Sequence, residues 1–168
     1  MSGINSTWDD LVKQSDGRYL TDRELQAFQQ YLQKLPVRIK TYEIFRDKGD
    51  AMVKMALKKF AATHPDVMQK YGKRCLYDMT ETVRIMAISI LRDDLLYFKE
   101  VLVFWQVNIL SAYQRQQACH KAYIDLQEVF TQYLPPAANQ LVKSYLDIVI
   151  ETLDRPVKLM ATVQRPGG

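Results

Sequence analysis

The side chains best suited to chemistry gather in one short stretch, residues 72–78, which reads Gly-Lys-Arg-Cys-Leu-Tyr-Asp. Cys75 is expected in the first turn of a long helix, where the helix dipole favours the thiolate form of a thiol. Asp78 follows three residues later, so its carboxylate would share the face that carries the thiol. Lys73 and Arg74 place two cations just ahead of that helix. Together these groups would suit a ligand with an electrophilic carbon, N–H groups and anionic arms.

A purely structural interpretation competes with that one: Cys75 would be a buried cysteine beside a capping aspartate, and these residues alone favour it. The other residues of catalytic type form no recognisable site. His64 and His120 are far apart, and neither lies in a metal-binding spacing such as HExxH. Cys119 and His120 are neighbours, which point about 100° apart on a helix and make a poor nucleophile–base pair. The sequence therefore predicts a protein that is not an enzyme and holds no metal.

The composition further restricts the class of protein to which this chain can belong. The chain has 168 residues, 48% hydrophobic and 25% charged, which suits one globular domain with a sizeable core. Its net charge of +4 permits an acidic partner or an anionic surface. The basic residues are dispersed, so nucleic-acid binding is not expected. No apolar stretch approaches the roughly 20 residues that span a bilayer, and residues 1–10 show no secretory signal. The two cysteines exclude a disulfide framework and favour a reducing, intracellular location.

Apolar residues recur at helical spacing along nearly the whole chain, and no strand-period run occurs. Thr21 with Glu24 forms a capping box, and the helix that follows should end or bend at Pro36. Interruptions are also expected at residues 47–50, where Gly49 suits the position after a helix end, and at 71–72.

The resulting helices are expected over 21–35, 37–46, 51–62, 75–91, 95–113, 117–133 and 137–153, with a short one beginning at Pro65. The helix over 95–113 is apolar around its circumference and should lie centrally in the core. The predicted fold class is all-α, with seven to nine helices in one domain over residues 1–168 and a loosely ordered tail over 155–168.

Against this helical background, Cys75-Leu76-Tyr77-Asp78 with Val83-Arg84 downstream resembles the bilin-attachment motif of phycobiliproteins, the light-harvesting subunits that include allophycocyanin and phycocyanin. Four further segments are similar to patterns of the same family: Gly17–Thr21 with Glu24-Leu25, His64–Val67, Ile90–Asp94 and Ser144–Asp147. They occur in the family's order on a chain of suitable length, over about residues 5–153. The chain is therefore identified as a member of that family.

The resemblance implies a globin-like helical core with an N-terminal helical pair, residues 1–34, that docks a partner subunit. It implies a linear tetrapyrrole (a bilin, with phycocyanobilin as the favoured form) joined by a thioether to Cys75. Asp78 would accept hydrogen bonds from the central pyrrole N–H groups, and Arg74 would contact a propionate. Lys73 and Tyr77 would also belong to the site, and Tyr123 would pack along the ring system. The implied function is that of a phycobilisome antenna subunit, peripheral to the cytoplasmic side of the thylakoid membrane.

Several positions depart from the family's pattern. The motif arginine two residues after the cysteine is Tyr77 here, and the loop before Cys75 is shorter than usual. Most family members are acidic, whereas this chain is basic. The acidic residue that pairs with a partner's arginine is replaced by Gln14, while Arg84 keeps the other half of that pairing. The alternative is therefore a divergent binding, assembly or regulatory protein on the same fold, without a covalent bilin.

The N-terminal segment predicts an interaction surface. Apolar side chains stand on both sides of Gly17 within residues 8–32, and two short amphipathic helices ahead of a core cannot bury both apolar faces on their own. The expected partner is a homologous phycobiliprotein subunit, in a homo- or hetero-oligomer, contacted through residues 8–32 and Arg84, with linker proteins as further partners. Because Gln14 carries no charge, apolar packing should dominate that contact and make it resistant to salt.

Overall fold

The computed structural model describes residues 5–103 and 116–154, and within them every regular element is helical. The elements are α1 (Ser6–Gln14), α2 (Asp22–Thr63), α3 (Pro65–Arg92), α4 (Leu95–Phe98), the π-helical segment η1 (Lys99–Val103), α6 (Gln116–Tyr133) and α7 (Pro136–Asp154). The predicted all-α class is confirmed. The predictions for residues 104–113 and for the tail 155–168 lie outside the described residues.

The structure confirms the predicted helix starts after Thr21 and at Pro65 and the break at Pro135-Pro136. Thr21 Oγ1 accepts from the Glu24 backbone N–H at 3.4 Å, and the Glu24 carboxylate accepts from the Thr21 backbone N–H at 2.7 Å, which completes the capping box. Pro65 is the first residue of α3. The Pro135-Pro136 pair separates α6 from α7, whose bounds lie within one residue of those expected.

The predicted breaks inside α2 are wrong, because one helix of 42 residues runs through both Pro36 and Gly49. Gly49 is buried, and a Cβ added to it would lie 3.4 Å from Val83 Cγ1 on α3. Its small size thus allows α2 and α3 to approach closely, and it does not end a helix. Just beyond Pro36, the buried Arg38 donates to Asp93 at 2.6 Å and to the Tyr31 carbonyl at 3.1 Å, tying this part of α2 to the end of α3.

The predicted break at Tyr71-Gly72 is also wrong, since α3 continues from Pro65 to Arg92. One glycine inside a helix costs only about 1 kcal/mol, which the packing of the surrounding turns offsets. Cys75 therefore lies ten residues after the start of α3 and not in its first turn. The expected effect of the helix dipole on its thiol is corrected accordingly, because that effect fades within the first turn.

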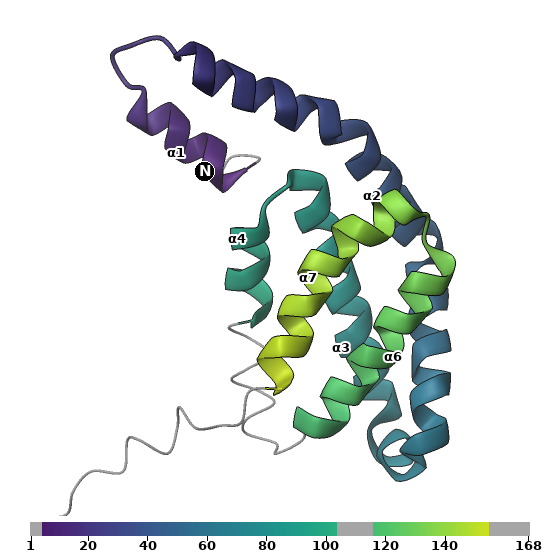
Figure 1. The fold of residues 1–168 in the computed structure, drawn as a ribbon. Helices are drawn as coiled ribbons and strands as arrows, with labels where there is room; N and C mark the ends of the chain where they lie inside the picture. The colour runs from purple at the N-terminus through teal and green to yellow at the C-terminus, as the bar shows by residue number, and fades with distance from the viewer. Residues whose placement is uncertain (1–4, 104–115, 155–168) are drawn as a thin grey trace, which may run out of the picture.

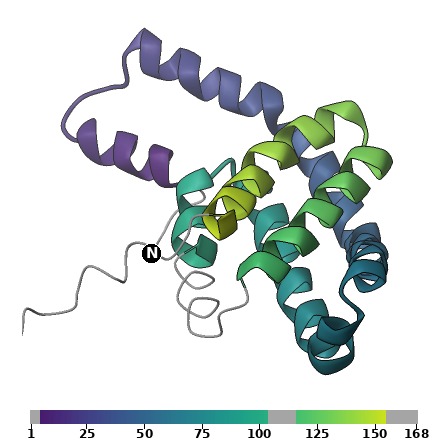
Figure 2. The ribbon, with the colours of Figure 1, turned by 60° about the horizontal axis from the view of Figure 1, so that its bottom comes forward.

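The core lies between the second half of α2 and helices α3, α6 and α7, which stand side by side in Figures 1 and 2. Residues 95–103, which follow α3, lie only partly in the core. Phe98 and Leu102 are fully buried, but Leu95, Leu96 and Val101 are exposed, so the prediction of a helix buried all round is wrong for its described part.

α1 and residues 22–36 of α2 form an arm that projects from this core (Figures 1 and 2). Trp8 packs edge-on against Phe28 and Tyr31, with ring centroids 5.0 and 5.8 Å apart. The second arm segment is the beginning of a long helix and not a separate short one. The arm is also held at its base: the Asn5 amide donates to the carbonyls of Arg92 and Asp93, at 2.9 and 2.8 Å.

Candidate functional site

The site predicted from the sequence centres on Asp78, whose two carboxylate oxygens have different surroundings. Arg74 Nε donates to Asp78 Oδ2 at 2.8 Å, an ion pair across one turn of α3. Asp78 Oδ1 is buried and has no hydrogen-bond partner within the described residues. Arg74 thus fixes the orientation of the carboxylate while leaving one acceptor oxygen in a place that water does not reach.

An unsatisfied buried acceptor is costly, about 1–3 kcal/mol and more for a charged group, so native proteins rarely leave one without a purpose. A partner for this oxygen would have to be a donor, and the N–H groups of a linear tetrapyrrole are donors of the right kind. A carboxylate that accepts N–H bonds forms charge-assisted hydrogen bonds, which are the stronger class. The residues present therefore fit the group that the resemblance implies.

Cys75 shares a face of α3 with Asp78, because the two residues are three positions apart on a continuous helix. Its side chain is half-buried and packs against the hydrophobic core. The structure thus keeps the thiol and the carboxylate on one face of α3 but places the thiol away from the helix end.

The wall beside this face comes from α6. Thr82 Oγ1 donates to the Asp78 carbonyl at 2.9 Å and shares a buried hydrogen bond of 2.7 Å with the Tyr123 hydroxyl. Tyr123, which the resemblance assigns to the pigment site, is thereby bonded to the turn of α3 that follows Asp78, and its side chain is buried. Sequence reasoning missed Thr82. Its position four residues after Asp78, which puts it on the same helix face, could have indicated it.

The structure does not bring Lys73 and Tyr77 to this face. Each is two residues from Cys75, and at about 100° per residue both side chains leave the helix roughly 160° away from it. Lys73 is exposed, and Tyr77 is 60% exposed with the Arg74 guanidinium 5.8 Å from its ring centroid. Arg84, predicted at a partner contact, is also exposed and pairs with Glu81 at 2.7 Å and with Asp50 at 3.9 Å.

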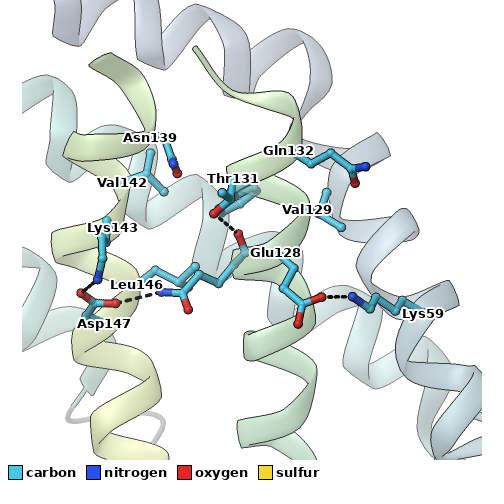
Figure 3. A pocket seen from close by; sticks show the side chains of 12 residues that line it. Lys59, Glu128, Val129, Thr131, Gln132, Asn139, Val142, Lys143, Leu146 and Asp147 are labelled. Atoms are coloured by element: carbon cyan, nitrogen blue, oxygen red, sulfur yellow. Dashed lines mark hydrogen bonds and ion pairs between the residues drawn. The ribbon is translucent and has the colours of Figure 1, made fainter. Parts of the chain in front are cut away.

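A groove of about 650 Å³ is lined mainly by residues of α6 and α7, which are remote in sequence from Cys75 (Figure 3). The sequence analysis did not predict this groove. Its charged side chains are paired with one another. Asp147 accepts from Gln127 at 2.8 Å and from Lys143, and Lys59 pairs with Glu128. Because these charges are already neutralised, the groove offers a weaker case for a ligand than Asp78 does.

No cluster of three potential metal ligands occurs in the described part of the chain. His64, one of the two candidate histidines, stacks on Phe60 and contacts the Thr63 hydroxyl. Within the same residues no helix is both long enough and apolar enough to cross a membrane.

A family model described as "Phycobilisome protein" matches residues 11–153, which include the whole of the Cys75–Asp78 region. The chain belongs to the phycobilisome protein family. Phycobilisome proteins are pigment-binding antenna proteins with a light-harvesting role, and they assemble into oligomers at the periphery of the thylakoid membrane. The search of curated proteins returned no match to this chain.

Proposed function

We propose that this phycobilisome protein is an antenna subunit that carries a bilin on Cys75 and passes excitation energy to neighbouring pigments. The observation that carries the proposal is the buried, unpartnered Oδ1 of Asp78, one turn from a thiol on the same face of α3. The motif spacing of Cys75 and Asp78 agrees with it. Phycocyanobilin is the form that we favour.

The chain's own groups have separate tasks in this proposal. Cys75 would hold the pigment through a thioether, formed by addition of its thiol to a carbon–carbon double bond of the bilin with the proton going to the adjacent carbon, so that no oxidant would be needed. Asp78 accepts N–H bonds through Oδ1 and favours a protonated, extended pigment. Arg74 holds Asp78 in place and stands ready for an anionic arm, since its side chain is 56% exposed. A bound bilin would supply the conjugated system that absorbs visible light.

The arm is the proposed contact with a homologous subunit. Leu25, Phe28 and Leu32 lie along one side of α2 and remain 44%, 41% and 45% exposed, although Trp8 packs against Phe28. An apolar stripe exposed to this extent is typical of an interaction surface. The proposal also places Arg84 at the edge of that contact. It includes linker proteins as further partners and a location on the cytoplasmic side of the membrane.

Pigment chemistry tests the bilin. The chain is expressed in cells that make phycocyanobilin, purified, and denatured in acidic urea. Visible absorption and zinc-dependent fluorescence should stay with the polypeptide, and Cys75→Ala should lose both. Cys119→Ala, which removes the other thiol, is the matched control and should keep them. Colourless protein from bilin-producing cells would overturn the proposal.

A second candidate, a binding or assembly protein without a covalent bilin, is favoured by one specific observation. Tyr77 replaces the motif arginine and points away from Cys75, so one propionate contact of the family is absent. This candidate predicts pigment that is released on denaturation, or pigment binding that survives in Cys75→Ala.

A further inference from the structure

The net positive charge of the chain comes from one segment. Residues 54–78 contain six Lys and Arg residues and two acids, a net charge of +4 that equals the charge of the whole chain. The remaining residues carry 17 basic and 17 acidic side chains. This asymmetry is a feature of the sequence that neither the bilin site nor the arm explains.

The fold gathers this charge on one hairpin, made of the end of α2 and the first half of α3. The two helices run side by side in opposite directions (Figures 1 and 2). The Arg84–Asp50 contact of 3.9 Å and the close approach of Gly49 to Val83 set their register. Residues after Asp50 on α2 therefore lie beside residues before Arg84 on α3, which brings both sets of lysines to the same end of the molecule.

Two of the six cations of this segment are paired within the fold. Lys59 pairs with Glu128 and Arg74 with Asp78. The other four, Lys54, Lys58, Lys70 and Lys73, are exposed and have no ion-pair partner within the described residues; they are called the hairpin lysines below. α2 contributes Lys54 and Lys58, four residues apart, and α3 contributes Lys70 and Lys73, three residues apart. Each pair therefore lies on one face of its own helix.

The two hairpin lysines of α3, Lys70 and Lys73, share their side of that helix with Tyr77, which follows Lys73 by four residues and is 60% exposed. Arg84, a further seven residues along, marks this side as the one next to α2. The face is opposite the one that carries Cys75, so it is separate from the proposed pigment site. Lys73 and Tyr77, which the resemblance assigned to the pigment, belong to this second surface.

We propose that the hairpin lysines and Tyr77 form a docking surface for a protein face rich in carboxylates. A lipid surface fits less well, because binding at a bilayer interface needs an apolar face to insert. Here the apolar sides of both helices, including Val53, Phe60 and Val83, are buried in the core, and Tyr77 is the one strongly exposed large apolar side chain of the hairpin. A second copy also fits less well, since the rest of the chain has no net negative charge.

The inference goes beyond the proposed function, since it requires no pigment. Docking of this kind is driven by charge and should be fast and salt-sensitive, with electrostatic steering raising association rates by about tenfold or more at low salt. The arm contact, by comparison, should depend little on salt.

The test compares two variants of the full chain with equal net charge. One replaces the hairpin lysines (K54Q, K58Q, K70Q and K73Q), and the other replaces exposed lysines outside both the hairpin and the arm (K40Q, K48Q, K99Q and K143Q). Glutamine keeps helix propensity close to that of lysine, and circular dichroism checks that both variants fold. The probes are an immobilised allophycocyanin preparation of acidic pI and vesicles with one-fifth anionic phospholipid.

We expect the parent chain to bind the acidic protein faster and more tightly at low salt than at high salt, with the arm contact accounting for any binding that remains at high salt. The hairpin variant should associate about tenfold more slowly or worse, while the control variant stays within about twofold. Lysine-to-arginine replacement at the same four hairpin positions should restore binding. Equal losses in both glutamine variants, binding to vesicles alone, or no binding to the acidic protein would each overturn the proposal. Because Cys75→Ala should bind like the parent, failure here is distinguishable from failure of the pigment proposal.

Discussion

Asp94 should be among the most sensitive positions of the fold, because one buried carboxylate joins three elements. It caps α4 by accepting from the Tyr97 backbone N–H at 3.0 Å. It accepts from Ser6 at the start of α1, at 3.0 Å from the backbone N–H and 2.8 Å from the hydroxyl. Arg92 lies 3.3 Å from the same carboxylate. Asp94→Ala would leave these donors without their acceptor.

The magnitude follows from the contacts that are lost. Removing an N-cap costs about 1 kcal/mol, and a hydrogen bond to a charged acceptor contributes roughly 1.5–3 kcal/mol. Since some donors can turn to water, we expect Asp94→Ala to lower the free energy of unfolding by about 3–4 kcal/mol. Asp10→Ala is the matched control: its partner Lys13 is exposed at 3.5 Å, and such pairs contribute under about 1 kcal/mol.

Urea unfolding followed by circular dichroism at fixed protein concentration measures the effect. Ser6→Ala combined with Asp94→Ala should cost less than the sum of the single changes, because both remove the same contact. A loss below about 1 kcal/mol for Asp94→Ala, or strict additivity with Ser6→Ala, would refute the role of Asp94 as the junction between the arm and the core.

The pH dependence of unfolding provides a second test of the role of Asp94. Burial acts to raise the pKa of Asp94, but the hydrogen bonds from Tyr97 and Ser6 and the charge of Arg92 together bring it below its ordinary value of 3.8. A carboxyl with a lowered folded-state pKa contributes stability that is present above its unfolded-state pKa and is lost as the pH falls through the folded-state value. The acid limb of unfolding should therefore be shallower in Asp94→Ala.

Three further outcomes are expected. Gly49→Ala should be neutral or slightly stabilising and Gly49→Leu destabilising in thermal unfolding, because a Cβ meets Val83 at 3.4 Å but a larger side chain has no room; a strong loss for Gly49→Ala would contradict this. The hydrogen bond from Arg18, with those from Thr21, lowers the pKa of Glu24 from 4.5 to about 2. The stability that Glu24 contributes is therefore present above pH 4.5 and is lost as the pH falls toward 2. Glu24→Gln should remove that part of the pH dependence of arm helicity, measured by circular dichroism. Light scattering should show an oligomer that persists at high salt and is lost when residues 1–20 are deleted; a monomer at micromolar concentration with the arm intact would contradict it.

The sequence alone determined those features whose causes are local. Thr21 and Glu24 complete a capping box from within four residues, and Pro65 begins a helix because its ring suits the first turn. The Cys75–Asp78 spacing, together with the other motifs, was sufficient to indicate the family. Each of these depends on chemistry between near neighbours, which the order of residues states directly.

Tertiary contacts decided the rest. Gly49 looks like a helix break until α2 and α3 pack together at it. Gly72 looks like one until α3 is seen to continue through it, which places Cys75 far from a helix end. That continuity also turns Lys73 and Tyr77 to the opposite side from the thiol. The bonds from Asn5 and Ser6 to residues 92–94 join parts of the chain up to 88 positions apart. Local propensity amounts to about 1 kcal/mol per residue, so packing over long helices overrides it.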